Sequence, residues 1–325
     1  MNLKEVTETE SPPVHQYTPE IHEGLSKLLE VSEYLDFPFT VEEAANYFLP
    51  RSNMTAAQLH SLLAHPDFAD LKFVLKDGYL FTSERQSIDS RFEREKVSAA
   101  KLESAAGIAK LLTKLVPFIR TIAVTGSVAY GSADKWDDVD LFIITERNRL
   151  WMSMFLMLLQ IRLYKILGLR PAHLLPFCLS YMHDEEGFSK ESRRSRTNPL
   201  FARELLKAKP IAGTPKYRKI LEENKWVEEF YSTPYRDTLR LLETGFDGER
   251  KSPEVPFRFL SFPLVWAEGI SYLILSRYLR VRAHLTNLKL KSEGKNLRAF
   301  EPNICRVSCV YTSNFYRWLS ALWGA

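Results

Sequence analysis

The fold is decided by two apolar stretches in the middle of the chain, Arg120-Thr121-Ile122-Ala123-Val124-Thr125-Gly126-Ser127 and Asp138-Val139-Asp140-Leu141-Phe142-Ile143-Ile144-Thr145. Each has the composition of a short buried strand, and the second begins with two aspartates. Because side chains alternate along a strand, Asp138 and Asp140 should point the same way, about 6–7 Å apart along the chain. This pairing of a Gly-Ser turn with twin acids predicts a ligand site at one end of a sheet.

Two carboxylates on one face of a buried strand are costly unless a cation or another partner neutralises them. Mg²⁺ takes oxygen ligands and is usually held by one or two carboxylates together with substrate phosphates. Gly126 lets the backbone approach a phosphate closely, and Ser127 is expected to cap the short helix that follows. The alternative is an ordinary turn followed by solvated aspartates, and Asp134 and Asp137 are expected to be solvated or capping residues of the loop.

The pattern Val124-Thr125-Gly126-Ser127, followed by Asp138-Val139-Asp140-Leu141, resembles the signature of the DNA polymerase β-type nucleotidyltransferase superfamily. The resemblance implies a magnesium-dependent transferase with two Mg²⁺ ions and a nucleoside triphosphate (ATP or another) as substrate. Asp138 and Asp140 would be the catalytic and metal-binding residues, and Gly126 and Ser127 would hold the β- and γ-phosphates. The nucleoside monophosphate would pass to an acceptor hydroxyl that the sequence does not identify.

In many members of this superfamily the third strand of the core carries a third carboxylate. The matching strand here is expected over residues 174–182, and it holds Cys178, Leu179, Ser180 and Tyr181 in place of an acid. Asp184 is the nearest acid and is therefore the first choice for the missing metal ligand, with Glu185, Glu186 and Glu204 as alternatives. Without a third acid, the catalytic competence of the chain is in doubt.

Basic residues gather at residues 189–196, which are expected to form a polar loop. Arg193, Arg194 and Arg196 are candidates to bind a triphosphate or a nucleic-acid backbone. The alternative is a solvated loop without a ligand.

The chain has 325 residues, 45% of them hydrophobic, with a net charge of +4, which suits two or three globular domains and a phosphate-bearing partner. We predict an α+β fold whose centre is a small mixed-sheet nucleotidyltransferase palm over residues 86–243, with helices over 85–115 and 147–167. Residues 1–19 are expected to be a disordered tail, and their polar sequence is neither a signal nor a transit peptide. Together with three sparse cysteines, this favours a cytoplasmic protein.

Residues 20–85 predict three helices followed by a hairpin around Asp77-Gly78, which is the layout of a winged-helix-like module. The candidate recognition helix at residues 55–64 holds no Lys or Arg, so a role in packing or in binding a partner protein is favoured over DNA binding. Residues 20–230 also resemble a group of prokaryotic proteins of unassigned substrate that combine such a module with this core, through motifs such as Phe37-Pro38-Phe39-Thr40 and Asn224-Lys225-Trp226-Val227.

Residues 244–325 predict a helical, basic C-terminal region that follows a linker at 245–256. An apolar helix at 259–278 is interrupted by Glu268, and seven basic residues follow between 277 and 298. A core helix is favoured over a membrane span. Weak contact of residues 259–298 with a membrane surface, or with RNA, is the alternative to a solvated basic face.

Three functions compete on these observations. The first is an active nucleotidyltransferase. The second is a degenerate nucleotidyltransferase that binds nucleotide without turnover, which the missing third acid motivates. The third is a winged-helix DNA-binding regulator, for which duplex binding should depend steeply on salt.

Overall fold

The computed structural model describes residues 18–52, 54–167, 177–244 and 261–323. The chain divides into two compact units, Met1–Ser87 and Ile88–Ala325, and each is described by itself. The predicted tail lies mostly outside the described residues, and so does the predicted linker at 245–256.

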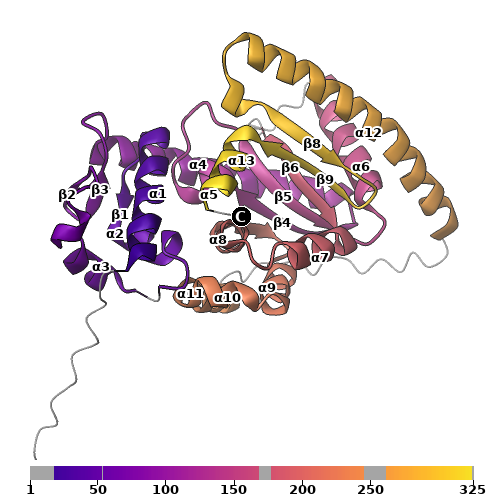
Figure 1. The fold of residues 1–325 in the computed structure, drawn as a ribbon. Helices are drawn as coiled ribbons and strands as arrows, with labels where there is room; N and C mark the ends of the chain where they lie inside the picture. The colour runs from indigo at the N-terminus through magenta and orange to yellow at the C-terminus, as the bar shows by residue number, and fades with distance from the viewer. Residues whose placement is uncertain (1–17, 53, 168–176, 245–260, 324–325) are drawn as a thin grey trace, which may run out of the picture. The chain divides into compact units, whose positions relative to one another are not determined.

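The first unit combines short helices with a small antiparallel sheet (Figure 1). Its helical elements are α1 (Pro19–Leu35), α2 (Val41–Glu43), a π-helical turn η1 (Ala44–Phe48), α3 (Ala56–Leu62) and a 3₁₀ turn η2 (Pro66–Phe68). Its strands are β1 (Phe39–Thr40), β2 (Val74–Lys76) and β3 (Tyr79–Phe81), in the order β1-β3-β2. The hairpin around Asp77-Gly78 is confirmed, because Lys76 pairs with Tyr79 across it. The winged-helix interpretation of this unit stays a prediction.

The second unit is built around one six-stranded mixed sheet in the order β7-β4-β5-β6-β9-β8. The strands are β4 (Ile119–Thr125), β5 (Val139–Thr145), β6 (Phe177–Asp184), β7 (Lys209–Ala212), β8 (Phe300–Ile304) and β9 (Ser308–Ser313). Strands β5 and β6 are parallel, and all the other neighbours are antiparallel. The mixed sheet and the predicted α+β fold class are confirmed.

Helices cover both faces of this sheet and connect its strands (Figure 1). They are α4 (Ile88–Leu115), α5 (Gly126–Tyr130), α6 (Leu150–Ile166), α7 (Glu185–Arg194), α8 (Pro199–Lys207), α9 (Thr214–Glu223), α10 (Trp226–Phe230), α11 (Ser232–Thr244), α12 (Ser261–Ser292) and α13 (Asn314–Leu322), with a 3₁₀ turn η4 (Asn296–Arg298). The central strands β4 and β5 are mostly apolar because both of their faces are buried along most of their length. Ile122, Val124, Leu141 and Ile143 pack with residues of α4 and α6 on one face, while Phe142 contacts the rings of α7 and α9 on the other.

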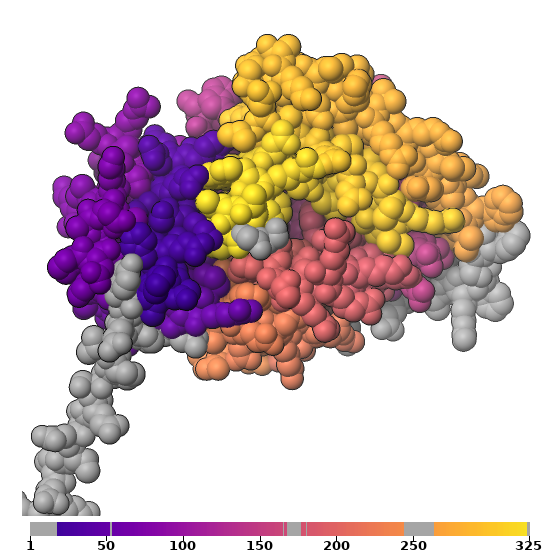
Figure 2. Space-filling view, viewed as in Figure 1, coloured from indigo at the N-terminus to yellow at the C-terminus, as the bar shows by residue number. Residues whose placement is uncertain are grey.

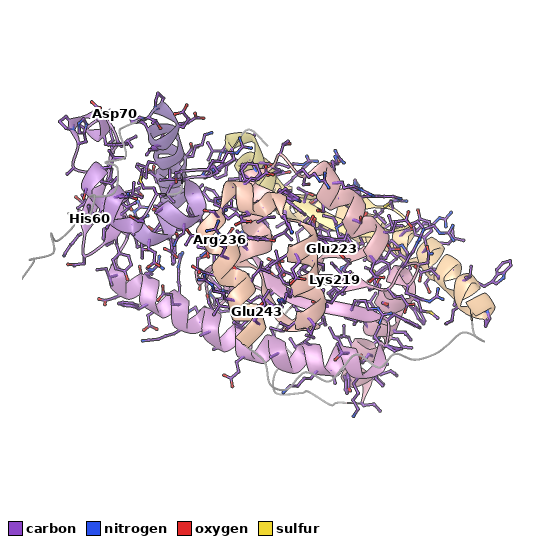
Figure 3. All side chains as sticks on the ribbon, turned by 90° about the horizontal axis from the view of Figure 1, so that it is seen from below. His60, Asp70, Lys219, Glu223, Arg236 and Glu243 are labelled. Atoms are coloured by element: carbon purple, nitrogen blue, oxygen red, sulfur yellow. The ribbon has the colours of Figure 1, made fainter. Side chains whose placement is uncertain are left out.

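Helices α9 and α11 pack side by side in the second unit, as Figure 3 shows for the labelled residues Lys219, Glu223, Arg236 and Glu243. The guanidinium of Arg218 joins them, because it lies 2.9 Å from Glu222 on its own helix and 2.6 Å from Glu243 on α11. These are exposed ion pairs, which contribute little to stability and mainly fix the pairing of the two helices.

The predicted helical C-terminal region is confirmed by α12 and α13. It was expected to be separate from the core, however, and strands β8 and β9 extend the core sheet, with Met182 of β6 paired to Cys309 of β9. Residues 259–298 also hold one continuous helix, α12, of 32 residues. Local sequence could not reveal the strand pairing, because a strand partner about 130 residues away leaves no local signal.

Glu268 explains how an apolar helix with one acid is held on the core. Its carboxylate is buried and accepts hydrogen bonds from the backbone N–H groups of Trp151 (2.9 Å) and Met152 (2.7 Å) at the start of α6. A carboxylate at a helix N-terminus satisfies donors that have no partner inside the helix and complements the helix dipole. Burial raises the pKa of Glu268, and these two bonds offset only part of that rise. In the described residues, no helix is long and apolar enough to cross a membrane.

The buried imidazole of His183 in β6 makes the stability of the core depend on pH. Burial lowers its pKa from 6.5 to about 4, and neither ring nitrogen has a hydrogen-bond partner among the described residues. The unfolded chain therefore binds a proton between pH 6.5 and pH 4 that the folded chain does not, so the free energy of unfolding should fall as the pH falls through this window. The loss from His183 is roughly 3 kcal/mol at most.

We expect His183→Leu to reduce the dependence of the free energy of unfolding on pH between 6.5 and 4, because leucine cannot take up a proton in the unfolded chain. The measurement is urea unfolding of both proteins at several pH values between 7 and 4. Identical pH curves for the two proteins would contradict the assignment.

Candidate functional site

The centre of the candidate site is the close approach of Gly126 to Asp140. Thr125 pairs with Asp140 across the antiparallel strands β4 and β5, so the turn that leaves β4 passes directly over the carboxylate. Gly126 has φ +64°, and a Cβ at this position would lie 2.5 Å from Oδ2 of Asp140. Only glycine fits here, because a side chain would be strained in this backbone conformation and would also collide with the carboxylate.

Three ligand-type side chains meet beside this glycine. One ligand atom each from Asp138, Asp140 and Cys178 lies within 4.8 Å of the others. Asp138 is exposed, while Asp140 and Cys178 are half-buried. The prediction that the two aspartates point the same way is therefore consistent with the geometry, and Cys178 joins them because it is the register partner of Asp140 on the parallel strand β6.

The helix that begins at this turn differs in detail from the prediction. Helix α5 starts at Gly126, its N-cap residue is Thr125, and no side chain caps it. Ser127 therefore lies in the first turn and is not the cap. Its carbonyl accepts a hydrogen bond from the N–H of Ser132 (2.9 Å), which closes the chain behind the helix.

The loop that carries Asp138 is held by helix α4. The ammonium of Lys101 is buried and donates to the backbone carbonyls of Asp134 (2.6 Å) and Asp137. The hydroxyl of Ser98 accepts from the N–H of Ala133 (3.0 Å). Asp137 accepts from the N–H of Asp134 (2.9 Å), which agrees with a capping role for the loop acids. These bonds fix the backbone just before Asp138, and a fixed backbone keeps its carboxylate near Asp140.

Helix α8 holds α5 from the other side. The hydroxyl of Tyr130 donates to Glu204 (2.7 Å), and the guanidinium of Arg203 lies over the Tyr130 ring, 5.8 Å from its centroid. Burial raises the pKa of Glu204, while Arg203 and the Tyr130 hydroxyl act against this rise. Glu204 was one of the alternatives for the third acid of the site. Its carboxylate instead accepts the Tyr130 hydrogen bond that holds helix α5.

The prediction of Asp184 as a metal ligand together with Asp138 and Asp140 is wrong. Strands β5 and β6 are parallel, and Asp184 pairs with Thr145 at the opposite end of β5 from the aspartates. Its carboxylate is buried and accepts from the N–H groups of Gly187 (2.8 Å) and Asn148 (2.9 Å), so it caps α7. Asp184 was chosen because it is the acid nearest to this strand in the sequence. It lies, however, at the end of β6 that is remote from Asp138 and Asp140.

The basic stretch at residues 189–196 is also different from the prediction. Most of it belongs to helix α7 rather than to a loop, because Asp184 caps the helix and Glu186 pairs with Lys190 (2.6 Å) one turn later. Arg193 and Arg194 lie in the last turn and Arg196 follows, and all three are exposed. No contact among the described residues joins them to Asp138 or Asp140, so their role as phosphate ligands stays a prediction.

Sequence reasoning missed two contributors to the site. In the sequence, Cys178 stood out only because it occupies a strand position where an acid was expected. Its pairing with Asp140 follows once β5 and β6 are known to be parallel. Lys101 lies in a strongly charged helix, where its burial gives no signal in the sequence.

One comparison with known proteins gives a match. Residues 106–231 match the family model of the nucleotidyltransferase domain. This stretch runs from the second half of α4 to the end of α10 and includes the three residues of the cluster. No curated protein and no solved structure matches the chain significantly.

The Gly126–Asp140 contact can be tested by substitution. Gly126→Ala should lower the free energy of unfolding by about 1–3 kcal/mol, because the new methyl group meets both backbone strain and the Asp140 carboxylate. Gly294→Ala is a matched control, since Gly294 also has positive φ (+73°) but has nothing within 4 Å of its Cβ position. Urea unfolding should show the larger loss for Gly126→Ala. Equal losses would mean that the contact with Asp140 adds nothing.

Proposed function

We propose that the chain is a metal-dependent nucleotidyltransferase, because residues 106–231 match the family model of the nucleotidyltransferase domain. It would move a nucleoside monophosphate from a nucleoside triphosphate to an acceptor hydroxyl. The acceptor oxygen attacks the α-phosphorus, the bond from that phosphorus to the β-phosphate bridging oxygen breaks, and pyrophosphate leaves while the hydroxyl proton passes to a base or to water.

The observation that carries this proposal is the convergence of Asp138, Asp140 and Cys178 within 4.8 Å. Two carboxylates and a thiol at such distances fit a divalent cation, which would offset the repulsion between the two carboxylates. When bound, such ions neutralise the charge of the phosphates and align the attacking and leaving oxygens. Asp138 and Asp140 would hold them, with Cys178 as a third ligand.

Phosphate binding and the positioning of the metal ligands are assigned to the turn at Gly126 and to polar and basic residues elsewhere in the domain. The N–H groups of Gly126 and Ser127 lie in the first turn of α5, where no intrahelical acceptor is available to them, so they are suited to phosphate oxygens. Lys101 and Ser98 would act as positioning residues, because they hold the backbone before Asp138. Arg193, Arg194 and Arg196 would add positive charge for the triphosphate or for the acceptor. Residues 20–85 would bind a partner protein or nucleic acid.

The activity is tested by the release of pyrophosphate from each of the four common nucleoside triphosphates in the presence of Mg²⁺ or Mn²⁺. Asp138→Asn and Asp140→Asn should each lower the rate by about 10²–10³-fold, because each removes a charge that stabilises the transition state. The double variant should be little worse than either single variant, since the two carboxylates act as a unit.

Asp237→Asn, which changes an exposed acid on α11, is the matched control and should retain the full rate. Full activity of the double variant Asp138→Asn, Asp140→Asn would reject these residues as the metal ligands.

Cys178 favours a second candidate function, in which the domain binds nucleotide without turnover. A thiolate suits softer cations than Mg²⁺, so replacement of the third acid can leave nucleotide binding intact while it impairs the chemistry. This candidate predicts saturable binding of a nucleoside triphosphate in calorimetry with no pyrophosphate released under either metal.

Cys178 also predicts the metal preference of the site. Zn²⁺ should raise the melting temperature of the native chain more than Mg²⁺ does, because a thiolate ligand favours the softer ion. Cys178→Asp should reduce the extra stabilisation by Zn²⁺ relative to Mg²⁺. Cys305→Ser is the control, since Cys305 lies outside the cluster and contacts the Ser308 hydroxyl. A difference between the two metals that Cys178→Asp leaves unchanged would exclude Cys178 as a ligand.

A further inference from the structure

Helix α12 buries one face and leaves the other face apolar. Leu275, Leu279 and Ala283 recur every four residues and are buried against the core, where α12 contacts α6 and β8. The opposite face carries exposed apolar side chains, which we call the α12 stripe: Val265, Trp266, Ile270, Leu273, Ile274, Tyr278, Val281, Leu285 and Leu288. Monomeric soluble proteins rarely expose a continuous apolar surface of this extent, so the stripe calls for an occupant.

The stripe is long, and it lies at the border of its unit. The helix has 32 residues and so extends for roughly 48 Å. In Figures 1 and 2, α12 (orange) runs along the outer edge of the second unit. The neighbouring helix α6 has the same property, with Phe155, Leu159, Leu163 and Ile166 exposed along one of its faces.

The charges of α12 are of one sign. Between residues 265 and 292 the sequence has a single carboxylate, Glu268, and it is buried in the cap of α6. The exposed charges of the helix are all positive, namely Arg277, Arg280, Arg282, Lys289 and Lys291. They lie in the C-terminal half, whereas the exposed residues described for the N-terminal half, from position 263 on, are apolar.

This charge pattern discriminates between the possible occupants. Two copies that paired in parallel along the stripe would bring the basic C-terminal halves together, which is unfavourable. Antiparallel pairing would lay each basic half against the apolar half of the other copy, where α12 exposes no acid to pair with it. An anionic bilayer surface offers both an apolar layer for the stripe and negative headgroups for its basic residues. We infer that the exposed face of α12 docks on the surface of a membrane that contains anionic lipid.

The experiment measures sedimentation of the full chain with vesicles. Vesicles of an equal mixture of phosphatidylcholine and phosphatidylglycerol should bind the protein, vesicles of phosphatidylcholine alone should bind it far less, and added salt should release it. Arg282 and Lys291 enter no ion pair among the described residues, so they can be removed without breaking one. Arg282→Ala with Lys291→Ala should weaken binding by about fivefold for each charge removed.

The apolar part of the surface is tested by Ile274→Ser with Val281→Ser, which should weaken binding by about tenfold or more. Both side chains are more than half exposed, at 63% and 60%, so the fold should tolerate the change. The matched controls are Leu241→Ser, an exposed apolar residue of α11, and Lys219→Ala on α9. Neither control should change binding to the vesicles.

Two results would overturn the inference. The first is vesicle binding that the α12 variants leave unchanged. The second is an absence of binding to anionic vesicles. If sedimentation velocity in that case shows a dimer, and the double variant Ile274→Ser, Val281→Ser dissociates it, the occupant of the stripe is a second copy of the chain. Because the nucleotide site plays no part in the vesicle measurement, these results do not bear on the proposed transferase activity.

Discussion

The site depends on the absence of a side chain at Gly126. The register of β4 and β5 brings the turn after β4 onto the carboxylate of Asp140, and a Cβ there would lie 2.5 Å from Oδ2. This one contact links the start of α5 to the acid-bearing strand, so the turn at Gly126 and the cluster of Asp138, Asp140 and Cys178 have a fixed separation. Helices α4 and α8 then hold two further parts of the site, the loop before Asp138 and the helix α5.

The sequence predicted well wherever the structure follows from short-range patterns. The apolar strands around Asp140 and the hairpin at Asp77-Gly78 both rest on residues close together in the chain. A spacing of two residues along a strand was enough to bring Asp138 and Asp140 together.

The sequence failed where the relation between distant strands decides the outcome. Asp184 is near the end of its strand, but the parallel alignment of β5 and β6 puts that end away from the aspartates and brings Cys178 to them instead. The same limit hid the pairing of β9 with β6, and it hid the burial of Lys101 in an otherwise charged helix. Local composition does not encode which edge of a sheet a late segment will cover.

The pairing of β9 with β6 has a consequence for how the chain is made. Strand β6 carries Cys178 and lies inside the finished sheet, but its second neighbour is the segment Ser308–Ser313 near the end of the chain. During synthesis on the ribosome, β6 therefore keeps one unpaired edge from the time β7 has emerged until β8 and β9 follow, and such edges invite association with other chains. The nascent chain thus passes through a long interval in which the strand that carries Cys178 is open to mispairing.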